Sequence, residues 1–225
     1  MKQELMKYRK VLFVLIASVL MLAGVGTVKA EAAVPRNRAV AMYNRAIAYW
    51  GRKNAKVTVV HSMHTGTGAY SKCNKVGKKV SMRPLYYGQP RFIFRDLNGD
   101  GTIEALFYEG RYIYVFTIYR NSVRALGAIC AEEYITSAQV YYNAKLKSFS
   151  LKMNTTVRRT VIKTYQVYNG RLRCINTVSR YTGQMMSNYQ MEYAYYVNGR
   201  QMRYAYFRYY YYLCMGYAKR ISWAP

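Results

Sequence analysis

From residue 91 onward the chain alternates between short runs of apolar or aromatic residues and short polar turns. The runs are rich in valine, isoleucine and tyrosine, which favour strands. Asn-Gly pairs at 169–170 and 198–199 are strong hairpin signals. Strands are therefore predicted over 92–95, 103–108, 112–119, 123–129, 140–143, 146–153, 161–168, 172–181 and 189–197. This order predicts an antiparallel meander in a sheet of seven or more strands.

Two segments at the ends of this region favour helices. Between residues 38 and 50, four apolar side chains recur at intervals of three or four residues: Val40, Tyr43, Ile47 and Trp50. Residues 201–219 contain no helix breaker before Gly216 and predict a closing helix, although their tyrosines also favour a strand. The predicted fold class is α+β, a mostly antiparallel β meander with an N-terminal and a C-terminal helix.

The N-terminal segment is typical of an export signal. Its first ten residues carry four of the chain's basic side chains, and residues 11–28 carry no charge. Small residues around Ala30 suit cleavage near Glu31 or Ala33. The pattern predicts a signal peptide over 1–32 and a single β-rich domain over 33–225. An uncleaved membrane anchor is the alternative, which Gly24 and Gly26 weaken; no transmembrane segment is expected in the mature protein, which would be secreted or held at the cell surface.

The charge balance points to acidic partners. The chain has 35 Lys and Arg against 9 Asp and Glu. Removal of residues 1–30 takes away five basic residues and Glu4, which leaves a net charge of about +22. Such a charge favours a polyanion such as nucleic acid, an anionic cell-wall polymer or acidic lipid. The alternative is that an exported domain of this kind is basic through the habit of its lineage, without an acidic partner.

One acidic segment stands out in this basic chain. Its only two aspartates occur in the run from Asp96 to Glu104, which has the pattern Asp-x-Asn-x-Asp-Gly-x-x-Glu. In calcium loops, side-chain oxygens come from positions 1, 3 and 5, a glycine at 6 permits a sharp turn, and position 7 supplies a main-chain carbonyl. The predicted Ca²⁺ ligands are Asp96, Asn98, Asp100, Thr102 and Glu104.

The flanks of this segment predict a setting different from a helix-loop-helix calcium hand. Position 12, which needs a bidentate glutamate in that motif, is Phe107. Strand-like residues stand on both sides, so the sequence predicts a calcium-loop hairpin over 92–108. The alternative is a plain tight turn, because Asn-Gly and Asp-Gly pairs form hairpins without a metal. A plain turn does not require Asp96 and Glu104.

This layout resembles a group of secreted proteins of Gram-positive gut bacteria. The shared features are a signal peptide, an amphipathic helix, a strand leading into Asp-x-Asn-x-Asp-Gly-x-x-Glu, a tyrosine-rich strand and a late Tyr-Tyr-Val-Asn-Gly turn before a terminal helix. The resemblance reaches the level of a motif only over residues 92–108. It implies secretion and Ca²⁺ ligation by the five residues named above, and it implies no reaction.

The chemistry expected of an enzyme is sparse. Outside the loop and the signal segment, the glutamates at 109, 132, 133 and 192 offer no evident acid–base pair. His61 and His64 fall on a predicted strand at 57–62 or just after it, where residues three apart face opposite ways. We therefore expect no enzyme; a hydrolase that uses one of these histidines is the weakest alternative. Cys73, Cys130, Cys174 and Cys214 permit two disulfides or none.

Tyrosine is the remaining excess, with 27 residues. In stretches such as 203–209 it alternates with arginine, and exposed pairs of this kind could stack on sugars or bases while arginine binds phosphate. For any single tyrosine, a buried position is the expected one. The main hypothesis is a secreted, non-enzymatic calcium-binding domain with a structural Ca²⁺ site. The alternative is a basic, tyrosine-rich binding module for an anionic cell-envelope polymer or nucleic acid.

Overall fold

A computed structural model describes residues 34–63, 76–82, 91–109, 111–131, 139–155, 159–185 and 191–223. These residues belong to one compact unit, Val34–Pro225. The predicted signal peptide over 1–32 lies outside the described residues, as do Cys73, His64, Glu132 and Glu133.

The first sheet has six strands in the order β2-β1-β6-β5-β4-β3. Their bounds are β1 (Lys56–Ser62), β2 (Lys79–Ser81), β3 (Arg91–Arg95), β4 (Glu104–Glu109), β5 (Tyr112–Tyr119) and β6 (Ser122–Cys130). Neighbouring strands are antiparallel except β1 and β6, which run parallel with Val59 opposite Ala128. β3 through β6 form the predicted meander, and β1 joins it from outside.

The parallel contact of β1 with β6 depends on a glycine. The pairing of β5 with β6 shifts by one residue near Gly127, which has φ 140°. A Cβ atom at Gly127 would lie 2.5 Å from Cγ2 of Val60. The missing side chain therefore allows β1 to approach β6 closely, and few other residues tolerate this backbone conformation.

The second sheet has seven antiparallel strands in the order β12-β11-β10-β9-β8-β7-β13. Their bounds are β7 (Gln139–Asn143), β8 (Ser148–Thr155), β9 (Arg159–Tyr168), β10 (Arg171–Met185), β11 (Met191–Val197), β12 (Arg200–Met202) and β13 (Lys219–Ile221). Asn169 and Gly170 both have positive φ, at 49° and 64°, which suits a two-residue hairpin turn. β13 returns to pair with β7 at the far edge of the sheet.

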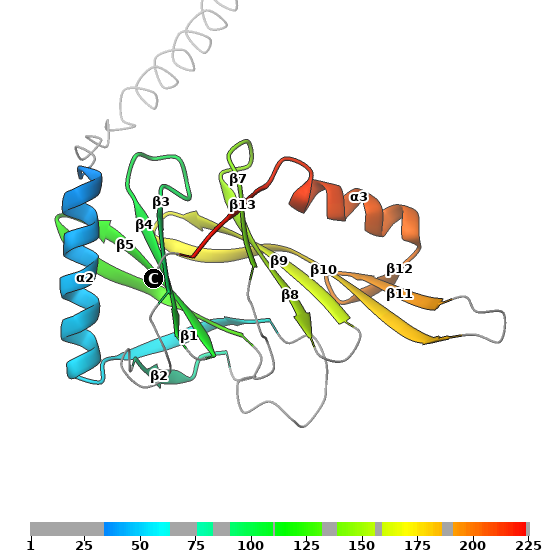
Figure 1. Cartoon of the computed structure of the whole chain (residues 1–225), viewed down its shortest axis with the longest axis horizontal. Helices are drawn as coiled ribbons and strands as arrows, with labels where there is room; N and C mark the ends of the chain where they lie inside the picture. Colours follow the sequence, from blue (N-terminus) through cyan, green and yellow to red (C-terminus); the bar gives the residue numbers. More distant parts are fainter. Residues whose placement is uncertain are drawn as a thin grey trace, which may run out of the picture. The chain divides into compact units, whose positions relative to one another are not determined.

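The two sheets and two helices enclose three apolar clusters. Figure 1 shows how these sheets and helices are arranged. Helix α2 (Arg36–Arg52) buries Ala39, Tyr43 and Ile47 in a cluster with one face of the first sheet. The largest cluster combines residues of both sheets, such as Leu106 and Phe149. Helix α3 (Tyr204–Met215) covers the other face of the second sheet through Phe207 and Cys214.

The α+β class and a helix near each end are confirmed. The strands divide between two sheets, whereas the sequence analysis predicted one. Both faces of each sheet carry buried side chains, as β4 illustrates with four consecutive buried residues, and a second layer is needed to cover them. The C-terminal helix is also shorter than predicted, because residues 200–202 and 219–221 pair as edge strands.

Candidate functional site

The acidic segment connects β3 to β4 at one end of the first sheet. Arg95 pairs with Glu104 at the base of the hairpin, so residues 96–103 form the loop between them. Gly99 and Gly101 have φ values of 71° and 86°, a conformation that favours glycine. The two glycines therefore permit the sharp turn that a calcium loop requires.

Side-chain oxygens of the loop accept hydrogen bonds from its own main chain. The Asp96 carboxylate accepts from the Gly99 and Gly101 amides at 2.6 and 3.0 Å. Asp100 accepts from the Thr102 amide at 2.7 Å, and Asn98 Oδ1 accepts from the Asp100 amide at 2.9 Å. These bonds hold the first, third and fifth loop positions close to one another.

The Asn98 amide links two carboxylates. Its Nδ2 donates to Asp100 Oδ2 at 2.8 Å and to Glu104 Oε1 at 3.3 Å. An amide N–H carries partial positive charge, so this donor stands between two negative groups where a cation would also be favourable. Among the described residues, no set of three or more His, Cys, Asp or Glu side chains lies close enough to bind a metal as the side chains stand.

Glu104 is the buried acid of the site. Its side chain has no exposed surface and accepts from the Leu97 amide at 2.7 Å and from Thr117 Oγ1 at 3.4 Å. Burial, with smaller contributions from the Asp100 and Asp96 carboxylates, raises the pKa of Glu104 to about 8. Glu104 is therefore largely protonated at neutral pH, and a cation bound beside it would favour its ionised form.

The donor set fits Ca²⁺ in its chemistry. All candidate groups are hard oxygens, as Ca²⁺ requires: the carboxylates of Asp96, Asp100 and Glu104, the Asn98 amide oxygen and the Thr102 main-chain carbonyl. Rotation of the Asn98 amide would turn Oδ1 instead of Nδ2 toward the two carboxylates. The third and fifth positions, Asn98 and Asp100, then have the ligand types that the sequence motif predicts.

The loop is tied to both sheets and to α2. The Tyr43 hydroxyl of α2 donates to the Ile103 carbonyl at 2.5 Å. Leu97 is buried in the cluster that both sheets share. On the opposite side, a Cβ atom placed on Gly99 would lie 2.9 Å from Cε of Lys147, in the β7–β8 turn. Figure 1 shows this turn beside the β3–β4 loop.

Lys147 was not foreseen as part of the site. The motif covers only residues 96–104, and nothing in the sequence brings a turn fifty residues later to the same place. Arg95 directly precedes the loop in the chain. Its guanidinium lies 4.4 Å from the ring centroid of Tyr142. These two cations lower the negative potential of the loop and oppose a bound metal ion.

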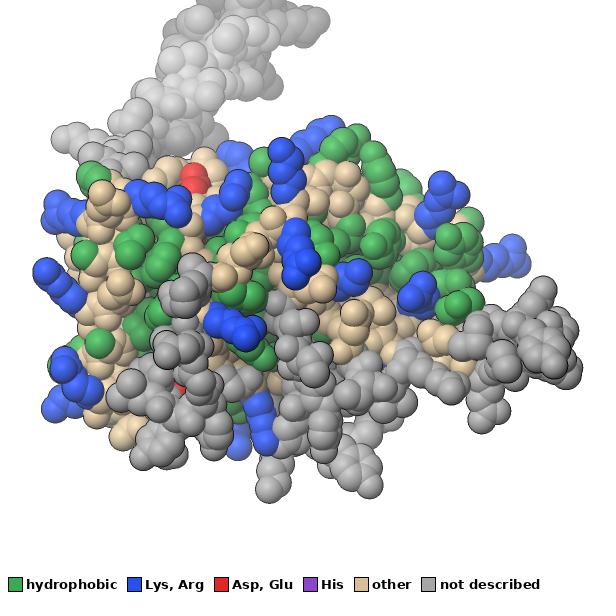
Figure 2. Space-filling model, in the orientation of Figure 1, with side chains coloured by type: hydrophobic (Ala, Val, Ile, Leu, Met, Phe, Trp, Pro, Cys, Tyr) green, Lys and Arg blue, Asp and Glu red, His purple; other side chains and the backbone are tan. Residues whose placement is uncertain are grey.

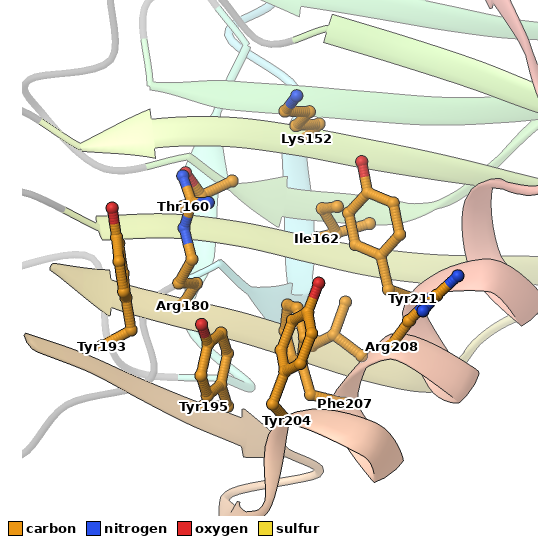
Figure 3. A pocket seen from close by; sticks show the side chains of 11 residues that line it. Lys152, Thr160, Ile162, Arg180, Tyr193, Tyr195, Tyr204, Phe207, Arg208 and Tyr211 are labelled. Atoms are coloured by element: carbon orange, nitrogen blue, oxygen red, sulfur yellow. The ribbon is translucent and has the colours of Figure 1, made fainter.

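A second candidate site is a cavity of about 450 Å³ between α3 and the second sheet (Figure 3). Its apolar lining consists of Ile162, Val178 and Phe207, which are buried in one cluster. The sequence did not indicate this cavity, because strands β8 to β11 and helix α3 all contribute to it.

Basic and aromatic side chains complete the cavity wall. Lys152, Arg180 and Arg208 supply three cations. Four tyrosines also line it, at positions 193, 195, 204 and 211. In Figure 3 all four tyrosine hydroxyls point the same way, toward the side where Lys152 and Thr160 lie.

The expectation that individual tyrosines are buried is wrong for α3. Phe207 and Cys214 are its buried residues, whereas Tyr206 and Tyr209 are 61% and 60% exposed. Tyr204 and Tyr212 are exposed as well. The helix spans only three turns and contacts the sheet along one narrow stripe, so most of its aromatic side chains remain in solvent.

The remaining candidate residues are involved in packing. His61 Nε2 lies 3.2 Å from the Leu172 carbonyl oxygen, and its ring centroid lies 5.3 Å from that of Tyr165. Burial lowers the pKa of His61. Cys130 is disulfide-bonded, whereas Cys174 and Cys214 are free.

Comparison with known proteins finds no matching family model, no matching curated protein and no matching solved structure. Within the described parts of the chain, neither helix has the length and apolar character needed to cross a membrane.

Proposed function

We propose that this chain is a secreted, non-enzymatic calcium-binding domain in which Ca²⁺ has a structural role in the β3–β4 loop. The observation that carries the proposal is the position of the Asn98 amide group. Its Nδ2 donates both to Asp100 and to Glu104, and the Glu104 side chain is buried. A divalent cation would favour the ionised form of Glu104 and would add its charge to the main-chain and Asn98 donors that already contact the three carboxyl groups.

The proposed role is stabilisation of the junction between the sheets. The loop joins β3 to β4, contacts the β7–β8 turn through Gly99 and Lys147, and is bonded to α2 through Ile103. A cation that binds only the folded loop would stabilise these contacts together. Lys147, Arg95 and the net positive charge oppose binding, so we expect a weak site with a dissociation constant of about 0.1–1 mM.

Thermal unfolding with Ca²⁺ and with a chelator tests the proposal. At about 1 mM Ca²⁺ the stabilisation should be about 0.4–1.4 kcal/mol, which corresponds to a rise in Tm of about 1–5 °C. Asp96→Ala and Asp100→Ala should abolish the rise. Glu109→Gln is the control, because it removes one carboxylate outside the loop. Identical melting of the wild type in both conditions, with no calorimetric binding at millimolar Ca²⁺, would show that the loop is a plain turn.

A second candidate, a binding module for an anionic polymer, is favoured by exposed arginine–tyrosine pairs. The Arg124 guanidinium lies 4.4 Å from the ring centroid of Tyr119, and that of Arg173 lies 5.0 Å from the ring centroid of Tyr168. Both tyrosines are exposed. Figure 2 shows lysine and arginine side chains spread across the face in view, with hydrophobic side chains, a class that includes tyrosine, between them. Such a surface suits electrostatic, weakly selective binding.

A further inference from the structure

The cavity under α3 combines an apolar surface with cations and has no acidic lining residue. Ile162 and Val178 are each 1% exposed and Phe207 is 8% exposed, so they form the floor beneath the cavity, whereas the exposed rings of Tyr193, Tyr204 and Tyr211 supply its accessible apolar surface. Its volume of about 450 Å³ lies within the range of small-molecule sites, about 300–1,000 Å³. The cavity is thus suited in size to an organic molecule rather than to a lone ion.

The three cations make this cavity selective for charge. Lys152 lies on β8, Arg180 on β10 and Arg208 on α3, so the positive groups come from three different elements around one space. The Arg180 guanidinium lies 5.4 Å from the ring centroid of Tyr193, which orients it along the aromatic wall. An anionic group here would gain charge-assisted hydrogen bonds without competition from a lining carboxylate.

The tyrosines add flat surfaces and hydroxyl groups. Tyr195 packs against Tyr204 and Phe207. Its ring centroid lies 5.1 Å from that of Tyr204 and 4.8 Å from that of Phe207. This arrangement leaves aromatic faces and edges toward the cavity, while the hydroxyls point to the side where Lys152 lies (Figure 3). The apolar part of a ligand would contact the rings, and its polar part would face the hydroxyls and cations.

We propose that the cavity between α3 and the second sheet binds an amphipathic organic anion, in which an apolar ring or chain carries a carboxylate, sulfonate or phosphate group. The apolar part contacts the rings of Tyr193, Tyr204 and Tyr211 above the buried floor. The anionic group is bound by Arg180, while Lys152 and Arg208 add positive charge at other parts of the rim (Figure 3). This site is separate from the calcium loop and does not depend on a bound metal.

Isothermal titration calorimetry with naphthalene-2-sulfonate tests the site, because this probe joins a flat apolar body to a permanent negative charge. Naphthalene-2-sulfonamide is the neutral partner of nearly equal size. We expect the sulfonate to bind at least tenfold more tightly than the sulfonamide, since only the sulfonate can form ionic hydrogen bonds. Dodecanoate in a separate arm distinguishes a chain-like ligand from a ring-like one.

Two arginines on the same strand provide matched variants. Arg180→Gln should weaken sulfonate binding about tenfold, and Arg208→Gln should weaken it less, because its guanidinium lies on the other side of the cavity (Figure 3). Arg173→Gln removes the same charge from β10 at an exposed arginine that also stacks on a tyrosine but does not line the cavity, so it should leave the affinity within twofold. Circular dichroism would check the fold of each variant.

Three results would overturn the proposal. The first is equal affinity for sulfonate and sulfonamide. The second is an equal loss of affinity in the Arg173 and Arg180 variants, which would indicate nonspecific attraction to the basic surface. The third is binding of adenosine monophosphate or dextran sulfate through Arg180 when neither naphthalene-2-sulfonate nor dodecanoate binds, which would assign the cations to a polar ligand.

Discussion

At the scale of single residues, the candidate calcium site depends on where charge lies relative to solvent. Asp96 and Asp100 are the expected surface ligands, but Glu104 is buried and bonded to the Leu97 amide. The loop therefore combines solvated carboxylates with one that burial penalises. Because Glu104 is buried, the free energy of unfolding should depend measurably on pH.

The Ca²⁺-free protein should lose stability as pH rises. The pKa of Glu104 is raised from 4.5 to about 8 in the folded protein, so between these values the folded state binds more protons than the unfolded state. The free energy of unfolding should therefore decrease across this range, by up to about 5 kcal/mol. Urea unfolding of wild type and Glu104→Gln measures the contribution, because the variant cannot titrate at this position. A parallel pH dependence in both proteins would contradict it.

Lys147 should weaken calcium binding. Its side chain lies against Gly99, and its ammonium group adds positive charge beside the loop. Lys147→Met should lower the dissociation constant for Ca²⁺ about two- to fivefold, in line with interactions of exposed charges of about 0.2–1 kcal/mol. Lys145→Met is the control, because Lys145 belongs to the same turn but lies over the ring of Tyr217. Calcium titration by calorimetry would refute the role of Lys147 if both variants bound alike.

At the scale of secondary-structure elements, local sequence predicted what each segment forms but not which sheet it joins. The hairpin from β9 to β10 was predictable from Asn169-Gly170, because a two-residue turn fixes the pairing of the strands that flank it. The parallel pairing of β1 with β6 was not, because it joins Val59 to Ala128 across many intervening residues. The five loop residues were predictable because they are local, whereas Lys147 and the cavity under α3 depend on contacts between distant segments.

The bulge at Gly127 should tolerate no side chain. Gly127→Ala places a Cβ atom 2.5 Å from Val60 and imposes φ 140° on alanine, so we expect a loss of about 2–4 kcal/mol in unfolding free energy. Gly170→Ala is the matched control, since φ is also positive, at 64°, but no atom lies within 4 Å of the new Cβ. It should cost only about 1 kcal/mol. Chemical denaturation measures the unfolding free energy of both variants. Equal losses in the two variants would mean that contact with Val60 is unimportant.

At the scale of the whole molecule, basic residues exceed acidic ones almost fourfold. The described carboxylates of Asp96, Asp100, Glu104 and Glu109 all belong to the β3–β4 hairpin. Arginine–tyrosine pairs occur on both sheets, at Tyr119 and at Tyr168. The protein should therefore attract polyanions over much of its surface rather than at one groove.

Polyanion binding should be strongly dependent on salt. If about five phosphates are contacted, the logarithm of the association constant for DNA should fall against the logarithm of salt concentration with a slope of about −4 to −5. Fluorescence anisotropy with labelled duplex DNA measures this slope. No binding at low salt, or an affinity that salt does not change, would remove the binding-module hypothesis.

The return of β13 to β7 has a consequence for how the chain assembles. Ile221 pairs with Val140, so the outer edge of β7 gains its hydrogen-bonded neighbour only after some eighty further residues have been synthesised. Until then, the nascent polypeptide presents a row of free backbone amides and carbonyls beside the apolar side of the sheet. Unpaired strand edges of this kind are templates for aggregation. Premature termination after β12 and before β13 would thus produce an aggregation-prone fragment in which β7 to β12 are all made but the outer edge of β7 stays unpaired.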